Sequence, residues 1–500
     1  MKSRSQLLKI NTILSLTFQV VSLVCGFILP KLIIENYGSS INGLLSSITQ
    51  FLGFIALCEM GMGAVVPASL YKPLANRDNV EISKIVTSSE RFYKRIAFGM
   101  LIYIGFLIVF YPILINTYSF VFTTSLIIII ASSSFAQYYF GITYSLLIAA
   151  DQKQYITYVL NICTIIINLV VSYFLIELGC SIHIVKLFSA IIFLVRPIYY
   201  NLYVKSHYQL IYNIQYVEEP IKQKWNGVAQ HIAYTIQDKS GILVLSLLST
   251  LETVSVFSIY YMILEGVRGF VYSVTSSLTS FMGNILANGE KDTLDRNFIR
   301  IEWILHSITI LVFSSAAVLI IPFVRVYTIG VTDADYIVSV FPYIICAAIG
   351  CRCLQMPYNI VVQAAGHFKE TQNSAIIEPA INIIISIAFV KELGLSGVAI
   401  GMLVSILYRM MYLSLYLTRH ILFSSKLLLF KRIFVDIVMM SVIILICSLI
   451  PEEDTAYFFL ILMAIKVVTV ASIITILINI IFYHKLTIEF LSNILNRHTI

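Results

Sequence analysis

The segment INIIISIAFVKELG (residues 381–394) is almost entirely apolar, and it nearly repeats INLVVSYFLIELG (residues 167–179) with one inserted residue. A polar pattern, R-x-x-Y-x-x-x-Y-x-x-x-H, follows each copy at a constant offset of 213 residues. It reads Arg196, Tyr199, Tyr203, His207 in the first copy and Arg409, Tyr412, Tyr416, His420 in the second. Two matches in the same order are hard to explain by chance, so the sequence indicates an internal duplication.

The composition is that of a membrane protein. Of the 500 residues, 59% are hydrophobic and 12% are charged, whereas soluble domains carry about 25% charged residues. The mean hydropathy is +0.90. The apolar run near the amino end is longer than the core of a signal peptide, so we expect it to stay as a first transmembrane helix. Basic loops explain the net charge of +7, and we expect no nucleic-acid partner.

Long apolar segments recur along the whole chain. A membrane-spanning helix needs about 20 mostly apolar residues. On this basis the sequence predicts an all-α integral membrane protein with about fourteen transmembrane helices. The predicted spans are residues 7–34, 41–70, 96–116, 120–149, 155–177, 183–204, 226–249, 254–285, 301–327, 338–365, 371–390, 396–418, 432–450 and 456–483.

Lysine and arginine gather in alternate loops, as the positive-inside rule requires of cytoplasmic loops. With the amino terminus inside, the residues of the inner side include Lys72, Arg77, Arg91, Arg300, Lys431 and Arg432. The opposite loops, such as GVTDAD (330–335) and PEEDTA (451–456), hold almost no basic residues. We therefore predict that both termini are cytoplasmic.

The duplication relates two pairs of predicted spans. The pair 155–177 and 183–204 corresponds to the pair 371–390 and 396–418. An even number of spans separates the two copies, so both have the same orientation in the membrane. Parallel repeats of this kind are related by an axis along the membrane normal, and transporters built from them bind substrate near the bilayer midplane.

These relations predict a two-lobed architecture. We expect two pseudo-symmetric six-helix lobes, residues 1–206 and 207–425, followed by two additional helices in residues 426–500. A transport cavity would lie between the lobes at mid-depth. The sequence therefore favours a transporter.

Charged and amide side chains lie near the middle of several spans, where they are costly unless they face a cavity or a partner. Arginine forks bind phosphate oxygens bidentately, so arginines around a cavity suit an anionic cargo. The candidate substrate-binding residues are Arg268, Arg352, Arg196, Gln19, Gln50, Glu59 and Gln137.

Each of the arginines also has a structural interpretation. Glu265 and Arg268 are three residues apart on one helix face, so they can neutralise each other. Arg352 has no acid within one turn of its own span, so its partner comes from another helix or from a ligand. Arg196 and Arg409 hold equivalent repeat positions, which suggests a shared structural role such as binding helix-end carbonyls.

A second group of polar residues suggests coupling to an ion. Glu378 and Asn382 lie one turn apart in an apolar span, and Asp238 lies at mid-depth of an earlier span. Pro379 removes one intrahelical hydrogen bond and leaves a carbonyl free. These oxygens form a candidate site for Na⁺ or H⁺. The alternative is a buried ion pair between Glu378 and Lys239. We identify no catalytic residue, no resident cofactor and no other metal site.

Four stretches resemble the oligosaccharide and polysaccharide flippases of the multidrug/oligosaccharidyl-lipid/polysaccharide exporter superfamily. They are GFILPKLI (26–33), YGSSINGL (37–44), FLGFIALCEMGMGAVVPASLYKPL (51–74) and the repeated helix pair with its ELG turn. The resemblance covers essentially the full length. It implies two six-helix lobes that rock between inward- and outward-open states and move a polyprenyl-diphosphate-linked oligosaccharide to the outer leaflet.

The related lipid II flippases imply further features of the site. They have arginines lining the cavity of the first lobe and a cation site on spans 7 and 11, where the three candidate coupling residues fall. At mid-depth of the first two spans this sequence has Gln19 and Glu59 instead of arginines. The resemblance therefore assigns diphosphate binding to Arg268, Arg352 and Arg196.

We expect a flippase for an undecaprenyl-diphosphate-linked oligosaccharide in a bacterial cell membrane, serving surface polysaccharide export. One alternative is a cation-coupled multidrug antiporter of the same superfamily, which would favour an acidic cavity and usually twelve spans. Another is a membrane glycosyltransferase or polymerase, but the predicted outer loops are too short for its catalytic domain, so we expect no enzyme. The expected partners are the lipid-linked oligosaccharide, membrane lipids and polysaccharide polymerase or export proteins.

Overall fold

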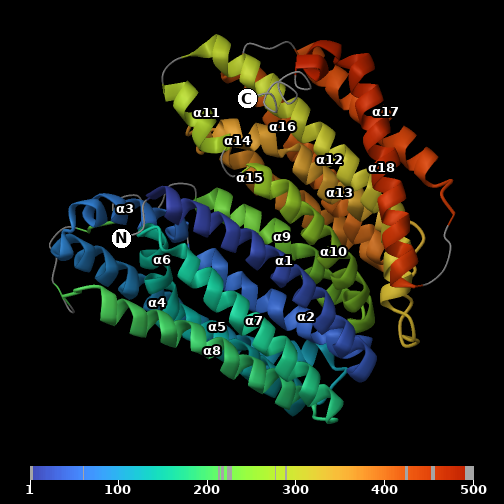
Figure 1. The fold of residues 1–500 in the computed structure, drawn as a ribbon. Helices are drawn as coiled ribbons and strands as arrows, with labels where there is room; N and C mark the ends of the chain where they lie inside the picture. Colours follow the sequence, from blue (N-terminus) through green and yellow to red (C-terminus); the bar gives the residue numbers. More distant parts are fainter. Residues whose placement is uncertain are drawn as a thin grey trace. The chain divides into compact units, whose positions relative to one another are not determined.

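The computed structural model describes residues 4–59, 61–211, 214, 219–221, 228–275, 278–287, 290–422, 426–451 and 456–489. All regular secondary structure in these residues is helical. The chain separates into two compact units, Met1–Leu247 and Leu248–Ile500 (Figure 1). Residues 452–455 of the last predicted outer loop lie outside the described residues.

The first unit is a bundle of long helices. In it α1 packs on α7, α7 on α8, α8 on α5, and α5 on α4. The short segments η1 and η2 are a 3₁₀-helix and a π-helix. The elements, in chain order, are α1 (Arg4–Tyr37), α2 (Ser39–Gly53), η1 (Phe54–Glu59), α3 (Met62–Asn76), α4 (Asn79–Ile115), α5 (Phe120–Ala136), η2 (Gln137–Gly141), α6 (Ile142–Ala150), α7 (Gln154–Glu177), α8 (Ile182–His207) and α9 (Val228–Leu248).

The second unit is organised around α12, which packs on α10, α13, α17 and α18. Helix α16 packs on α13 and, most extensively, on α15. The elements are α10 (Leu251–Thr275), α11 (Leu278–Ala287), α12 (Lys291–Tyr327), α13 (Phe341–Leu354), α14 (Met356–Ala364), α15 (Gln372–Leu393), α16 (Leu395–His420), α17 (Lys426–Cys447) and α18 (Tyr457–Phe482).

The fold class predicted from the sequence is confirmed. Each of the fourteen predicted spans coincides with one helix or with consecutive helical segments. Within the described residues, twelve helical segments are long and apolar enough to cross a membrane. The two remaining predicted spans contain α9 and α17, which carry charged residues such as Asp238 and Asp436 inside them. The chain is therefore a multi-pass membrane protein.

Several predicted spans are interrupted. The span 41–70 changes from α2 to η1 and resumes as α3, and the span 120–149 contains η2 between α5 and α6. The span 338–365 is divided at Gln355, where Pro357 lies in the first turn of α14. Proline lacks an amide hydrogen, so it is tolerated in a first turn but interrupts a continuing helix.

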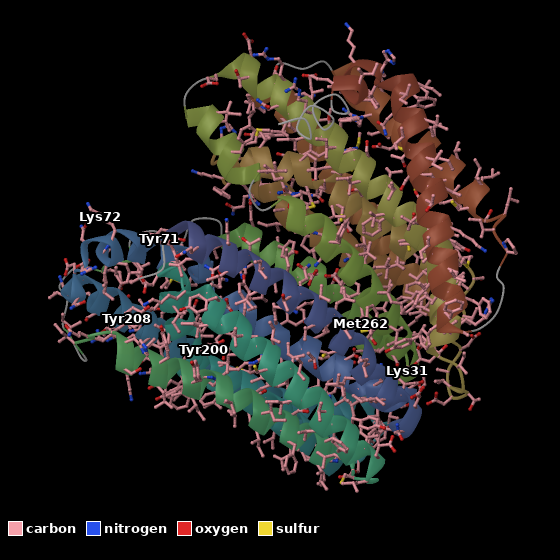
Figure 2. All side chains as sticks on the ribbon, in the orientation of Figure 1. Lys31, Tyr71, Lys72, Tyr200, Tyr208 and Met262 are labelled. Carbon is pink, nitrogen blue, oxygen red and sulfur yellow. The ribbon has the colours of Figure 1, made fainter. Side chains whose placement is uncertain are left out.

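The outward faces of the helices are strongly apolar (Figure 2). Ile102 on α4 and Ile481 on α18 are 80% and 72% exposed, and both lie within segments suited to span a membrane. Such exposure is costly in water but not against lipid, whose tails are as apolar as these side chains. The interior also holds buried polar and charged side chains, such as Glu378 and Arg409, and these define the candidate site.

The boundary between the compact units falls at Leu247 and Leu248, so α9 belongs to the first unit except for its last residue. This division is based on compactness, whereas the predicted boundary after residue 206 follows the repeat. Side-chain contacts explain the difference, because α9 is bonded to α2 and η1, as shown below. The lobe assignments 1–206, 207–425 and 426–500 stay predictions.

Candidate functional site

Two irregular helical segments meet at a carboxylate in the first unit. Glu59 is the last residue of η1, and Tyr138 lies in η2, where its hydroxyl donates a hydrogen bond to Glu59 Oε1. The neighbouring Gln137 opens the same π-helical segment. Single π-turns inside helices occur frequently at functional sites. Two of the predicted site residues, Glu59 and Gln137, therefore lie at backbone irregularities that the sequence did not predict.

Helix α9 is anchored to α2 and η1 by polar contacts. Lys239 Nζ donates to Gln50 Oε1 at 3.2 Å, and His231 Nε2 lies 3.0 Å from the carbonyl oxygen of Ala56. Lys239 was the partner considered for Glu378. The structure gives this lysine an amide oxygen of the first unit, and Glu378 belongs to the second unit, so that alternative stays a prediction.

Arg196 on α8 lies against α7. Its Nε donates to Thr164 Oγ1 at 2.8 Å, and the guanidinium lies 4.5 Å from the ring centre of Phe193. Its Nη2 is buried without a hydrogen-bond partner, as is Oδ1 of Asn168, one turn along α7. No acidic side chain of the described residues forms an ion pair with Arg196. The predicted binding of helix-end carbonyls is therefore wrong for Arg196.

In the second unit, Arg352 and Glu378 form a buried ion pair between α13 and α15. Arg352 Nη2 lies 3.2 Å from Glu378 Oε1, and the two side chains are 10% and 8% exposed. The contact lacks hydrogen-bonding geometry, since Oε1 has no hydrogen-bond partner. Arg352 thus takes its partner from another helix, which is one of the two possibilities inferred from the sequence.

Arg409 on α16 is buried close to the start of α15. Its Nη1 donates to the carbonyl oxygen of Thr371 at 2.9 Å and to the Ser374 hydroxyl. Thr371 precedes the first turn of α15, and its carbonyl oxygen also accepts from Ala375 N, so Arg409 binds the amino-terminal end of this helix. Arg409, Arg352 and Glu378 are three buried charged groups whose own net charge is +1.

The other predicted site residues form ion pairs or hydrogen bonds, or are partly exposed. Arg268 pairs with Glu265 on α10, so the neutralisation considered for this residue is correct. Asn382 Oδ1 accepts a hydrogen bond of 3.1 Å from Ser386. Gln19 is half-buried on α1. Asp238 belongs to the first unit and Glu378 and Asn382 to the second, so the cation site stays a prediction.

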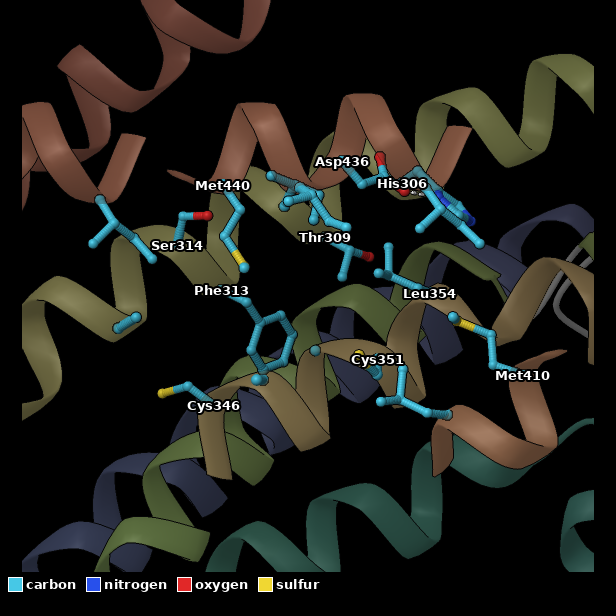
Figure 3. Close-up of a pocket in the computed structure, with 18 of the residues that line it drawn as sticks. His306, Thr309, Phe313, Ser314, Cys346, Cys351, Leu354, Met410, Asp436 and Met440 are labelled. Atoms are coloured by element: carbon cyan, nitrogen blue, oxygen red, sulfur yellow. Dashed lines mark hydrogen bonds and ion pairs between the residues drawn. The ribbon is translucent and has the colours of Figure 1, made fainter. Parts of the chain in front are cut away.

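The second unit contains a cavity of about 280 Å³ lined by α12, α13, α14, α16 and α17 (Figure 3). Most of its lining is apolar, for example Phe313 and Met440. One end is formed by His306 and Asp436, whose Nδ1 and Oδ2 atoms are 2.6 Å apart. His306 Nε2 and the hydroxyls of Thr309 and Ser314 are buried there without hydrogen-bond partners.

A second pair lies one helical turn from the first. Arg432 Nη2 on α17 lies 3.4 Å from Glu302 Oε2 on α12, and Tyr358 donates to the other Glu302 oxygen at 2.8 Å. Trp303 Nε1 donates to Asn479 Oδ1 on α18 at 2.5 Å. These contacts fasten α17 and α18 to α12 through buried polar groups.

Sequence reasoning missed this cluster. His306 and Asp436 each lie inside a predicted span, so the criterion that selected Glu378 also applies to them. Arg432 was read only as an inner-side basic residue, but it is 5% exposed and paired. Within the described residues, no group of three or more His, Cys, Asp or Glu side chains could hold a metal ion.

No family description and no curated protein matches the chain. Solved structures share its fold. The lipid II flippase MurJ in an inward closed conformation superposes with a TM-score of 0.70 and 15% identity, covering 95% of this chain and 99% of that one. An inward-facing multidrug resistance MATE family transporter of the MOP superfamily gives a TM-score of 0.61 and 15% identity, covering 81% and 98%.

A MOP superfamily transporter from Pyrococcus furiosus, described as having a binding pocket of reverse polarity, also superposes on the chain. Its TM-score is 0.59 and its identity 13%, with 82% of this chain and 96% of that one covered. At these identities the likeness concerns the fold. The chain is a multi-pass membrane protein whose fold is similar to those of a lipid II flippase and of MOP superfamily transporters.

Proposed function

We propose that the protein is a flippase that moves a polyprenyl-diphosphate-linked oligosaccharide from the inner to the outer leaflet by alternating access. The substrate would be an undecaprenyl-linked precursor of a surface polysaccharide, and the protein would reside in a bacterial cell membrane with both termini cytoplasmic. It would act with polysaccharide polymerase or export proteins and would not itself be an enzyme.

The extent of the fold likeness carries this proposal. The similarity to the lipid II flippase covers 95% of the chain, whereas the similarity to the inward-facing multidrug transporter covers 81%. A flippase-like fold therefore accounts for nearly all of the chain. The lipid II flippase handles a lipid-linked cargo, which supports the same class of cargo here.

The buried charges of the second unit support an anionic cargo. Arg352 and Arg409 outnumber Glu378, the acid near them, and a desolvated surplus of positive charge attracts an anion strongly. Arginine also suits the geometry of phosphate oxygens. We assign to Arg352 the role of binding the diphosphate, which would then compete with Glu378 for its guanidinium group.

Coupling to Na⁺ or H⁺ through Asp238, Glu378 and Asn382 is part of the proposal. Neutralising a carboxylate by an ion would shift the balance between inward- and outward-open states, provided that the ion binds the two states unequally. Glu378→Gln should make transport insensitive to the ion gradient. An unchanged response to the gradient would exclude Glu378 from coupling.

The test uses liposomes that contain the purified protein and a fluorescent polyprenyl-diphosphate oligosaccharide. Movement between leaflets is followed by quenching of the outer label. Arg352→Gln alone would strand Glu378, so the double variant Arg352→Gln/Glu378→Gln removes both charges of the pair and leaves the net charge of the site unchanged. We expect the double variant to melt near the wild-type temperature and to lose flipping. Arg296→Gln, on the exposed face of α12, is the control and should flip normally.

Retained flipping by the folded double variant would refute the role of Arg352. The same liposomes test the main alternative, a multidrug antiporter. The likeness to MATE transporters favours that alternative, and it would be supported if a lipophilic fluorescent cation, but not the lipid, were transported.

A further inference from the structure

The His306–Asp436 pair lies deep inside the second unit and is not among the residues assigned to cargo binding. Their side chains are 2% and 7% exposed, and Nδ1 and Oδ2 are 2.6 Å apart. His306 comes from α12 and Asp436 from α17 (Figure 3). Both lie within predicted membrane spans, where ionisable residues are rare and commonly take part in proton or ion pathways.

The pair belongs to a cluster of four ionisable side chains on α12 and α17, and the net charge of this cluster depends on His306. Glu302 and His306 are four residues apart on α12, and Arg432 and Asp436 are four apart on α17, so the two contacts stack on adjacent turns. With a neutral histidine the four side chains carry a net charge of −1. One proton on His306 makes the group neutral.

The groups packed around His306 leave this count unchanged. Tyr358 on α14 is a neutral phenol that donates to Glu302, with its ring 6.1 Å from the imidazole. Cys351 on α13 lines the same cavity, and α16 contributes only Leu407 and Met410. On the α18 side, Lys431 and Tyr483 contact each other near the surface, with Lys431 Nζ bonded to the Phe482 carbonyl oxygen.

Histidine is suited to exchange this proton. Its unperturbed titration lies between about pH 5 and 8, unlike that of any other unperturbed side chain. Nδ1 is held by Asp436, whereas Nε2 is buried, has no partner and lies at the cavity wall. Nε2 is therefore the atom at which a proton can arrive and leave.

We propose that His306 and Asp436 form a proton-binding site that links helix α12 to helix α17 and couples proton movement to transport. The coupling part rests on the proposed function. When His306 is protonated, a charged hydrogen bond joins the helices and the cluster is neutral. When the proton leaves, the cluster is anionic and the link is weaker. Proton release would thus free α17 to shift against α12.

The proton site is tested without any transport measurement. Protein labelled with ¹⁵N-histidine is reconstituted in liposomes and followed by solid-state NMR from pH 5 to 9. The His306 signal, identified by its absence from His306→Gln, should change between the neutral and charged forms, and its midpoint should move in Asp436→Asn. A His306 signal that is constant over this range would overturn the site.

Thermal unfolding of a matched series of variants is a second test of the proton site. The wild-type midpoint should fall by about 2–4 °C from pH 5.5 to pH 8 as the neutral cluster becomes anionic. His306→Gln fixes the negative charge and should melt lower at both pH values. His306→Gln/Asp436→Asn keeps a hydrogen bond between neutral groups and should melt independently of pH. His183→Gln, on α8, should retain the wild-type slope. A pH slope that persists in the double variant would overturn the site.

Coupling is then measured by flipping in liposomes with a pH difference across the membrane. A difference of one pH unit should change the steady-state leaflet ratio of the lipid by up to about tenfold in the wild type. The folded His306→Gln/Asp436→Asn variant should give the same ratio with and without the gradient. An unaltered gradient response in this variant would overturn the coupling. If wild-type protein moves no lipid while His306 still titrates, the proposed function fails and the proton site stands.

Discussion

The two copies of the repeated helix pair, α7–α8 and α15–α16, share a fold but hold their arginines differently. Arg196 in the first copy bonds the hydroxyl of Thr164, and Arg409 in the second bonds the Thr371 carbonyl and the Ser374 hydroxyl. Duplication has therefore preserved the cation at this position while its partners have diverged.

The divergence is clearest on the face that each first helix buries. Residues spaced by four form polar ladders, Thr164, Asn168 and Ser172 on α7, and Glu378, Asn382 and Ser386 on α15. The asparagine and the serine are the same in both ladders, but a threonine of the first copy stands where the second has a glutamate. The comparison teaches that ionic chemistry was concentrated in the second copy, with the acid that pairs with Arg352.

The second copy is also packed more closely. A Cβ at Gly401 would lie 2.4 Å from Ser386 Oγ and 2.8 Å from the Asn382 carbonyl oxygen, so glycine lets α16 approach the ladder directly. Small residues allow the same close approach in many membrane helix pairs. Helix α8 contains no glycine, and the ladder of α7 keeps a buried Asn168 oxygen without a partner.

The largest expected contrast is between the equivalent positions 378 and 164. Glu378→Gln removes the buried carboxylate that pairs with Arg352, which should lower the free energy of unfolding by about 3–5 kcal/mol. Thr164→Val removes a hydroxyl that accepts from Arg196 and donates to a carbonyl oxygen of its own helix, and it should cost about 1–2 kcal/mol. Denaturant unfolding in detergent measures both. Equal losses would show that the two copies are energetically alike.

A smaller effect is expected at the close helix contact. Gly401→Ala forces a methyl group against Ser386 and a backbone carbonyl, and overpacking of this kind costs about 1–3 kcal/mol. The control is Gly26→Ala on α1, where an added Cβ meets no atom within 4 Å. Melting temperatures should fall for position 401 and not for position 26. An unchanged melting temperature for Gly401→Ala would contradict the tight packing of the second copy.

The loops that lead into the repeated pairs are fastened differently, and this gives a prediction with a pH dependence. Tyr208, just beyond α8, donates to Asp151 Oδ2 at 2.7 Å (Figure 2), whereas in the second copy His367 Nδ1 and the Tyr416 hydroxyl are 2.9 Å apart. Burial, followed by the hydrogen bond with Asp151, raises the pKa of Tyr208 above its ordinary value. Tyr208→Phe should cost about 1.5 kcal/mol.

The raised pKa fixes the sign of the pH dependence. The stabilisation by Tyr208 should be complete below the unfolded pKa of about 10, and it should decline as the pH rises above that value. The free energy of unfolding of the wild type should therefore exceed that of Tyr208→Phe by the same amount at pH 7 and at pH 9. A difference that disappears by pH 9 would contradict the hydrogen bond.

The smallest effect concerns the turn before each pair. Gln152 and Gly366 occupy the same turn, with φ of 59° and 73°, and both turns have the same backbone hydrogen bonds to residues three and five positions earlier. A non-glycine residue is strained at such angles, so Gln152→Gly should stabilise by up to about 1 kcal/mol and Gly366→Gln should destabilise by about 1–2 kcal/mol. Opposite shifts in melting temperature are expected, and shifts of the same sign would refute the equivalence of the turns.

The sequence predicted the features that depend on local composition. Apolar length located helical segments at all fourteen predicted spans, and twelve of these segments are apolar enough to cross a membrane in the described residues. The pattern of Arg, Tyr and His located the repeat, whose two tyrosine–histidine ladders are stacked or tilted along their helices. Such signals depend on hydrophobicity and helical periodicity, which a single sequence displays.

Features that depend on packing between distant segments were not predictable in the same way. Glu378 is paired with Arg352, which lies on another helix of the second unit, and only the packing of that unit brings the two together. The η1 and η2 interruptions place Glu59 beside Tyr138, although no proline or glycine pattern marks η2 as a π-turn. His306 and Asp436 are 130 residues apart, and only the packing of α17 on α12 makes them a pair.

The most direct measurement compares two cargoes in the same liposomes containing the wild-type protein. One is a fluorescent undecaprenyl-diphosphate oligosaccharide, and the other is a lipophilic fluorescent cation. If the protein is a flippase for anionic lipid-linked glycans, the lipid should equilibrate between leaflets far faster than in protein-free liposomes, while the cation distribution stays unchanged. Transport of the cation with no acceleration of the lipid would contradict the proposed function.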